Sequence, residues 1–191
     1  MTPVRVAVLA SGGGTNLQAL LDALNGASIA PLARVTRVVT NQATAGALER
    51  ARKSGIPATV LQSPDDPAEL LAALGDAQLV VLAGYLKLIP ASVVARFRGR
   101  MINIHPALLP DFSGAGMYGH HVHEAVLASG TKESGVTIHF VDEAFDRGAI
   151  IAQERVPVEP GDTPDSLAAR VLAAEHRLLP RVVLDLAERI R

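Results

Sequence analysis

Two polar side chains, Asn103 and His105, stand where a short apolar segment ends, in the sequence Asn-Ile-His-Pro. Residues i and i+2 of a β-strand face the same side, so the two side chains are expected to project together. An asparagine amide can donate a hydrogen bond to a developing oxyanion, and a histidine can act as an acid or a base near neutral pH. The pair is therefore a candidate catalytic site.

A third candidate, Asp146, is expected on a loop between two later strands. A carboxylate beside an imidazole favours the protonated ring and raises its pKa, which would make Asp146 a partner for His105. Each residue also has an ordinary structural interpretation. A histidine after a strand is often simply a hydrogen-bonded polar residue, and the pattern Asp-x-Gly is often a turn. Spacing alone leaves both interpretations open.

A glycine-rich loop, SGGGTN at residues 11–16, lies between the first apolar segment and the first helical pattern. The first N–H groups of a helix have no partner within the helix, and glycines let a phosphate approach them closely. The loop lacks the Gly-Lys-Ser/Thr ending of a Walker motif, and Leu17 occupies the place of the third glycine of a dinucleotide fingerprint. The loop therefore predicts a phosphate site and not an NAD site, with a tight turn that binds nothing as the alternative.

The elements that must position these residues alternate between strands and helices over roughly the first hundred residues. Apolar, β-branched segments predict strands at 4–10, 34–40, 58–61, 78–83 and 101–104, and helical patterns lie at 16–25, 43–54, 67–74 and 90–97. Such alternation is typical of a doubly wound, mostly parallel sheet. Open sheets of this kind bind ligands at the carboxyl ends of their strands, which is where the glycine loop and Asn103 would lie.

The second half of the chain has a different pattern. A loop at 108–119 and a helix at 121–129 precede two alternating segments, 134–141 and 149–158, which are expected to pair as antiparallel strands. A long helix is expected to begin at Thr163, and Pro180 is expected to interrupt or kink it. No linker is apparent, so residues 1–191 are expected to form a single domain of the α/β class.

Composition excludes several classes of protein. Of the 191 residues, 49% are hydrophobic and 19% are charged, which is typical of a globular chain and not of a disordered one. The net charge of -1, without a long basic run, argues against nucleic acid as a partner, and the absence of cysteine excludes disulfides and thiolate metal sites. The apolar run 4–10 is too short for a signal peptide or a membrane span, so we expect a soluble, cytoplasmic protein with no membrane partner.

Five ordered segments resemble the glycinamide ribonucleotide formyltransferases: SGGGTNLQAL (11–20), VVLAGYLKLIP (80–90), INIHPALLP (102–110), GVTIHFVDEAFDRGAIIAQ (135–153) and GDTPDSLAARVLAAEH (161–176). These enzymes move a formyl group from 10-formyltetrahydrofolate to the amine of glycinamide ribonucleotide in purine synthesis. The resemblance runs from about residue 4 to about residue 185. It implies a Rossmann-like formyltransferase fold with a phosphate-binding half (about 1–100) and a folate-binding and catalytic half (about 101–191). The implied co-substrate is 10-formyltetrahydrofolate, and no metal is implied.

The resemblance also implies roles for individual residues. Asn103 and His105 would flank the formyl carbon, and Asp146 would assist His105. Glu175 would bind the ribonucleotide near its amine or its ribose. The substrate phosphate would be held by Gly14, Thr15 and Asn16. The folate pocket would be lined by Leu86, Lys87, Leu88, Ile89, Asn103, Val141 and Asp142, and segment 141–146 would close over the pteridine.

Two of the departures from the family pattern bear on the site. No basic residue stands between Lys53 and Lys87, so a basic contact to the folate tail that relatives have is missing or supplied elsewhere. The segment 112–119 is slightly longer than in many relatives and would border the substrate. A homodimer is a further possibility, since Phe97 and Phe112 could serve an interface, but burial in the core would explain both residues equally well.

Other functions stay open at this point. A methionyl-tRNA formyltransferase usually adds a C-terminal domain and a basic surface, and a formyltetrahydrofolate hydrolase usually adds an N-terminal regulatory domain; neither feature is visible in this sequence. A sugar-nucleotide formyltransferase is a further alternative within the superfamily. Outside it, the alternatives are a metal site built on His120, His121 and His123, whose spacing is poor for helical ligands, and a non-catalytic phosphate-binding module.

Overall fold

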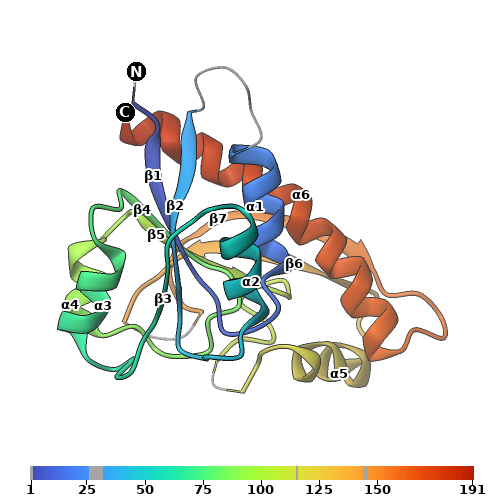
Figure 1. The fold of residues 1–191 in the computed structure, drawn as a ribbon. Helices are drawn as coiled ribbons and strands as arrows, with labels where there is room; N and C mark the ends of the chain where they lie inside the picture. Colours follow the sequence, from blue (N-terminus) through green and yellow to red (C-terminus); the bar gives the residue numbers. More distant parts are fainter. Residues whose placement is uncertain (1, 26–31, 115, 144–145) are drawn as a thin grey trace.

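The computed structural model describes residues 2–25, 32–114, 116–143 and 146–191, and their strands form one seven-stranded sheet (Figure 1). In chain order the strands are β1 (Val4–Leu9), β2 (Ala33–Thr40), β3 (Ala58–Val60), β4 (Leu79–Leu82), β5 (Met101–His105), β6 (Glu133–Phe140) and β7 (Ile150–Pro157). The helices are α1 (Thr15–Leu24), α2 (Gly46–Lys53), α3 (Pro67–Leu74), α4 (Ala91–Arg96), α5 (His120–Ser129) and α6 (Pro164–Ile190).

The strand order is β3-β2-β1-β4-β5-β6-β7, and pairing is parallel from β3 to β5. Strands β6 and β7 then add antiparallel to β5 and to each other. This confirms the predicted mostly parallel sheet with antiparallel strands in the second half. The order reverses between β1 and β4, so the carboxyl ends of these two strands open the crevice in which such sheets bind ligands.

The sheet is covered on both faces. Helices α1, α2 and α6 lie on one side of it and α3 and α4 on the other, as Figure 1 shows. The side chains of β1 alternate between the two faces. Val6 and Val8 are buried in the core on the side of α1, α2 and α6, and Ala7 and Leu9 are buried in the core on the side of α3 and α4. A strand buried on both faces carries a nearly continuous apolar run, which residues 4–10 display except at Arg5.

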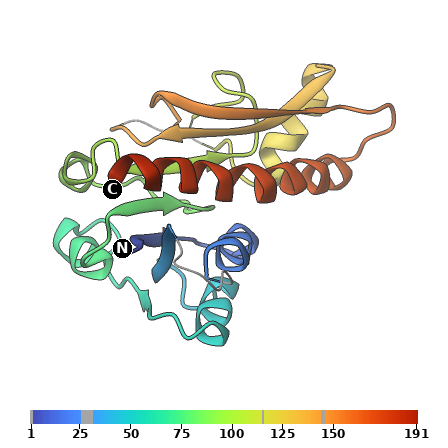
Figure 2. The same cartoon turned by 90° about the horizontal axis from the view of Figure 1, so that it is seen from above.

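Helix α6 runs without interruption for 27 residues, although Pro180 lies inside it. An interruption of the helix is therefore wrong, and a kink at the proline stays a prediction. Proline removes one backbone hydrogen bond and costs a helix roughly 3 kcal/mol. Here α6 packs along α1, β6 and β7, with α5 near its N-terminal end (Figure 2), and its residues around the proline, Leu178, Leu179 and Val183, are fully buried. Burial along such a long apolar stripe outweighs the lost bond.

No helix within the described residues has the length and apolarity needed to cross a membrane.

The two phenylalanines considered for an interface both contact the core. Phe97 is buried in the core beside α3 and α4, and Phe112 packs against the core on the other face. Core packing therefore accounts for both phenylalanines.

Candidate active site

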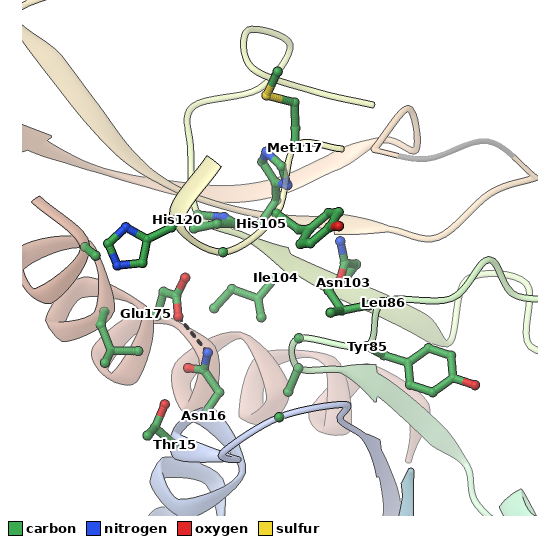
Figure 3. Close-up of a pocket in the computed structure, with 18 of the residues that line it drawn as sticks. Thr15, Asn16, Tyr85, Leu86, Asn103, Ile104, His105, Met117, His120 and Glu175 are labelled. Carbon is green, nitrogen blue, oxygen red and sulfur yellow. Dashed lines mark hydrogen bonds between the residues drawn. The ribbon is translucent and has the colours of Figure 1, made fainter. Parts of the chain in front are cut away.

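A cavity of about 560 Å³ opens at the carboxyl edge of the sheet, between the loops that follow β1, β4 and β5 (Figure 3). This volume lies within the range of roughly 300–1,000 Å³ found for small-molecule sites. All the predicted catalytic and substrate-binding residues line it: Gly14, Thr15, Asn16, Asn103, His105, Asp146 and Glu175. The cavity draws residues from both halves of the chain, so the predicted halves meet in one site.

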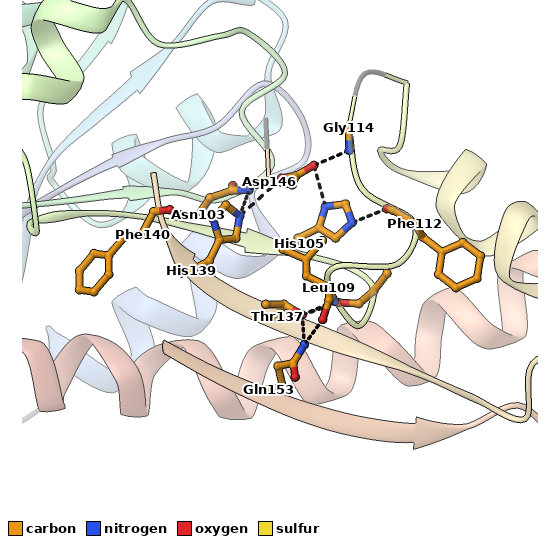
Figure 4. Close-up of polar contacts among 11 residues, drawn as sticks. Asn103, His105, Leu109, Phe112, Gly114, Thr137, His139, Phe140, Asp146 and Gln153 are labelled. Atoms are coloured by element: carbon orange, nitrogen blue, oxygen red, sulfur yellow. Dashed lines mark hydrogen bonds and ion pairs between the residues drawn. The ribbon is translucent and has the colours of Figure 1, made fainter. Parts of the chain in front are cut away.

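The Asp146 carboxylate contacts both polar residues of β5 (Figure 4). Its Oδ1 accepts a hydrogen bond from Nδ2 of Asn103 at 3.3 Å, and its Oδ2 lies 3.5 Å from Nδ1 of His105. The backbone N–H of Gly114 donates to Oδ2 at 3.3 Å. Strand β5 therefore presents Asn103 and His105 on one side, as their spacing predicts, and the loop between β6 and β7 brings the carboxylate to them.

Asp146 has an uncommon backbone conformation and a lowered pKa. Its φ of 55° lies in the left-handed region, which residues other than glycine seldom adopt. Burial pushes the pKa of Asp146 upward, but the hydrogen bond with His139, the charge of His105 and the Gly114 N–H together bring this pKa below its ordinary value. The side chain is therefore a carboxylate at neutral pH and accepts hydrogen bonds from Asn103 and from the Gly114 N–H.

His105 carries a proton on Nε2, because this atom lies 2.8 Å from the carbonyl oxygen of Phe112, which can only accept. Burial lowers the pKa of the His105 ring, and Asp146 and the Phe112 carbonyl offset only part of that effect. The sequence predicted a raised pKa from the carboxylate alone. That expectation is wrong in its net direction, because desolvation of a nearly fully buried ring disfavours its charged form.

His139, which no motif in the sequence singled out, completes the polar cluster. It lies opposite Asn103 in the β5–β6 pair, and its Nε2 is 3.1 Å from Nδ2 of Asn103 and 3.4 Å from Oδ1 of Asp146. Its Nδ1 donates to the carbonyl of Phe140 at 2.8 Å, which fixes the ring. The signal was present in the alternation of residues 134–141, but only the pairing register shows that His139 faces Asn103.

A second polar cluster supports the loop that follows β5. The Thr137 hydroxyl donates to the carbonyl of Ala107 at 2.7 Å and accepts from the N–H of Leu109 at 3.0 Å. The amide of Gln153 donates to the Leu109 carbonyl at 3.0 Å and to the Thr137 hydroxyl at 2.9 Å. Buried polar groups satisfied in this way hold a single conformation, so the loop leaves His105 along a fixed path.

The far end of the cavity joins the glycine loop to α6. Gly14 adopts a left-handed conformation with φ of 72°, and a Cβ at this position would meet Cα of Ala47 at 2.9 Å, so only glycine fits. Helix α1 begins at the next residue, Thr15, which places its unpaired N–H groups at the cavity. This is the arrangement in which helices bind phosphate groups.

Asn16 and Glu175 meet across this end of the cavity, as Figure 3 shows. Nδ2 of Asn16 donates to Oε2 of Glu175 at 2.6 Å, and within the described residues Oδ1 of Asn16 is buried without a partner. Burial raises the pKa of Glu175, an effect that the hydrogen bond from Asn16 offsets in part. A buried acceptor without a partner is costly, so a ligand with hydroxyl or amine donors would be stabilised here.

The predicted folate-binding residues divide between two places. Leu86 lines the main cavity. The others surround a neighbouring depression of about 40 Å³, and Asn103 lines both places. These wall residues are Lys87, Leu88, Ile89, Asn103, Val141 and Asp142. Of the segment predicted to close over the ring, residues 144 and 145 lie outside the described residues.

The three neighbouring histidines do not converge. Nε2 of His120 pairs with Asp165 at 2.8 Å, Nδ1 of His121 lies 3.4 Å from Glu124, and His123 lines the main cavity. Across the described ranges, no three His, Cys, Asp or Glu side chains are grouped as metal ligands would be. The alternative of a metal site on these histidines therefore has no geometric support there.

Comparison with known proteins agrees with the geometry. A chloroplastic phosphoribosylglycinamide formyltransferase of Arabidopsis thaliana is 46% identical over 193 residues, covering 96% of this chain and 65% of that protein. Its counterpart in Vigna unguiculata is 45% identical over 192 residues, covering 96% and 61%. The chain thus spans less than two thirds of the length of these two relatives.

A solved structure shares the fold. The phosphoribosylglycinamide formyltransferase of Anaplasma phagocytophilum superposes with a TM-score of 0.90 at 38% identity, covering 98% of this chain and 88% of that one. This likeness confirms the formyltransferase fold that the sequence motifs predicted. The sequence profile of the formyl transferase family matches residues 4–183. The chain therefore belongs to the formyl transferase family.

Proposed function

We propose that the protein transfers the formyl group of 10-formyltetrahydrofolate to the amine of glycinamide ribonucleotide, a step of purine biosynthesis. The observation that carries this proposal is the contact of one carboxylate, Asp146, with both Asn103 and His105 at the wall of the cavity. Two hydrogen-bond donors are thereby held side by side, and the far end of the same cavity suits a phosphate. The names of the relatives agree with this activity.

The cavity fits the ribonucleotide in one orientation. Its phosphate would bind at the glycine loop, through the N–H groups of Gly14, Thr15 and Asn16 at the start of α1. Asn16 and Glu175, joined by a hydrogen bond of 2.6 Å, would receive ribose or amine donors next to the phosphate. The amine would then lie near Asn103 and His105, where the formyl group must arrive.

The reaction follows from these positions. The substrate amine attacks the formyl carbon, a C–N bond forms, and the carbonyl oxygen becomes an oxyanion. Nε2–H of His105, in place of its bond to the Phe112 carbonyl, and Nδ2 of Asn103, in place of its bond to Asp146, donate to that oxygen. The bond from the formyl carbon to the folate nitrogen then breaks, and the proton released by the attacking amine passes to that nitrogen through His105 or a water molecule.

The co-substrate would occupy the depression beside the cavity. Leu88 and Ile89 offer apolar contact there, and Lys87 and Asp142 offer polar groups at its edge. The mechanism uses hydrogen bonding by Asn103 and His105 and proton transfer through His105 or water, and it calls for no metal ion.

A cytoplasmic location and a homodimer are further proposals from the sequence. Fractionation of cells tests the location, and sedimentation of the purified protein tests the oligomeric state.

The experiment that tests the function mixes purified protein with glycinamide ribonucleotide and 10-formylated folate and follows the absorbance change on deformylation. We expect turnover that requires the ribonucleotide. Deformylation without the ribonucleotide would identify a hydrolase instead. Folate binding without any transfer would point to a different acceptor, such as the amine of a sugar nucleotide.

A further inference from the structure

The glycine loop rests on helix α2 through two consecutive carbonyl groups. The N–H of Ala47 donates to the carbonyl of Gly12 at 3.2 Å, and Nε of Arg50 donates to the carbonyl of Gly13 at 2.7 Å. Both donors belong to the first two turns of α2. The loop is thus tied from one side at two adjacent peptide units.

These two bonds fix the direction of two N–H groups. In a trans peptide the C=O and N–H of one unit point in opposite directions. The carbonyls of Gly12 and Gly13 face α2, so the N–H groups of Gly13 and Gly14 face away from it. Over the described parts of the chain neither N–H meets a protein acceptor, and both glycines line the main cavity. Successive N–H groups oriented alike form an anion-binding concavity.

Close packing leaves the loop little room to shift toward α2. A Cβ added to Gly46, the first residue of α2, would lie 3.1 Å from both Cα and O of Gly13. A side chain at Gly46 would therefore displace the Gly13 peptide by a few tenths of an ångström. The start of α2 and the loop form one packed unit.

Arg50 is held at both ends of its guanidinium group. Nε donates to Gly13, and Nη1 donates to Oε1 of Gln18 on α1 at 3.2 Å. Its neighbour Arg52 differs: both of its hydrogen bonds go to Glu49, at 2.8 Å, on the exposed side of the same helix. The two arginines thus offer a matched pair of substitutions on one helix.

We infer that Arg50 is a positioning residue that makes the enzyme select a phosphorylated acceptor. Its bond to the Gly13 carbonyl directs the Gly14 N–H toward the substrate phosphate, and the packing of Gly46 against Gly13 limits how closely the loop approaches α2. This inference rests on the proposed function, because it takes the phosphate of glycinamide ribonucleotide as the ligand of the loop.

The test compares two acceptors, glycinamide ribonucleotide and the corresponding ribonucleoside without phosphate. The kcat/KM for glycinamide ribonucleotide is divided by the kcat/KM for the ribonucleoside. This ratio is measured in the wild type, Arg50→Gln, Gly46→Ala and Arg52→Gln. We expect Arg50→Gln and Gly46→Ala each to lower this ratio by about tenfold, the effect of one hydrogen bond to a charged group. Arg52→Gln should keep the wild-type ratio, and the KM for the formyl-folate should not change in any variant.

Two outcomes overturn the inference. An equal loss with both acceptors would mean that Arg50 only stabilises the fold. A lower ratio in Arg50→Gln with an unchanged ratio in Gly46→Ala would mean that the arginine charge acts without orienting the loop. If the wild type formylates neither acceptor, the proposed function fails, and calorimetry with inorganic phosphate then decides separately. Affinity for phosphate should fall about tenfold in both loop variants and stay unchanged in Arg52→Gln.

Discussion

Nδ2 of Asn103 lies 3.1 Å from Nε2 of His139, the residue directly opposite it in the antiparallel β5–β6 pair. The same ring nitrogen is 3.4 Å from Oδ1 of Asp146. Since Nδ1 of His139 is bound to a backbone carbonyl, the ring cannot rotate without breaking a hydrogen bond. The first antiparallel strand of the sheet thereby fixes the amide and the carboxylate that face the reacting group.

The first prediction concerns His139 as a positioning residue. Replacement by leucine removes the group that orients Asn103 and Asp146, and misplacement of catalytic groups by about 1 Å costs up to roughly a hundredfold in rate. We expect His139→Leu to lower kcat by about tenfold to a hundredfold. Steady-state kinetics with both substrates measures this, and His121→Leu, at an exposed position on α5, is the matched control.

The coupling of His139 to Asp146 can be measured separately. If the histidine acts through the carboxylate, His139→Leu should cost much less in an Asp146→Asn background than in the wild type, because contacting residues are not additive. Independent, multiplying effects of the two substitutions would contradict this role for His139.

The second prediction concerns the oxyanion donors. Loss of one such donor typically costs about 2.7–4 kcal/mol of transition-state stabilisation. Asn103→Ala and His105→Ala should therefore each lower turnover by about a hundredfold or more, with little change in substrate affinity. Asp146→Ala should do the same, because it removes the carboxylate that contacts both donors. Kinetics over a range of ribonucleotide concentrations separates kcat from KM. Near-wild-type turnover in His105→Ala would refute the assignment.

The parts of the site that depend on local chain geometry could be predicted from the sequence. Asn103 and His105 project together because a strand has a period of two residues, and the glycine loop follows the first buried strand because β–loop–helix units place it there. Both predictions need only residues that are close in the chain. The alternation of strands and helices predicted the sheet for the same reason.

What the sequence could not provide depends on long-range packing. His139 reaches Asn103 through a strand register that no local pattern fixes. The direction of the His105 pKa required its burial, which outweighs the charge of Asp146. Pro180 is a strong local signal for a helix break, yet packing against the strands keeps α6 continuous. In each case a tertiary environment overrides the local preference of the residue.

The third prediction concerns the ionisation of His105. The Asp146 carboxylate raises the pKa of this ring and offsets part of the lowering caused by burial. Asp146→Asn removes the charge and keeps the shape, so the pKa of His105 should fall further below its ordinary value. Titration of the ring resonances by NMR measures the shift, and His105→Ala identifies the signal. An unchanged or higher pKa would show that the carboxylate does not act on His105.

The last prediction concerns Glu175, where stability and function should oppose each other. Burial raises its pKa, so the folded chain keeps a proton at pH values where the unfolded chain has released it. The stability from this difference is fully present below the ordinary pKa of 4.5 and is lost as the pH rises through the folded pKa. Glu175→Gln keeps an acceptor for Nδ2 of Asn16 without the titration. The free energy of unfolding of the variant relative to the wild type should therefore increase with pH.

Denaturant unfolding of both proteins between about pH 5 and pH 8 measures this difference. A pH-independent difference would contradict the buried, titrating carboxylate. The same variant should bind glycinamide ribonucleotide about tenfold more weakly, because the amide replaces one of the two carboxyl oxygens at the end of the cavity with an NH2 group, which cannot accept a hydrogen bond from the substrate. Greater stability at pH 8 combined with weaker binding would show that Glu175 is kept for the substrate, at the expense of the fold.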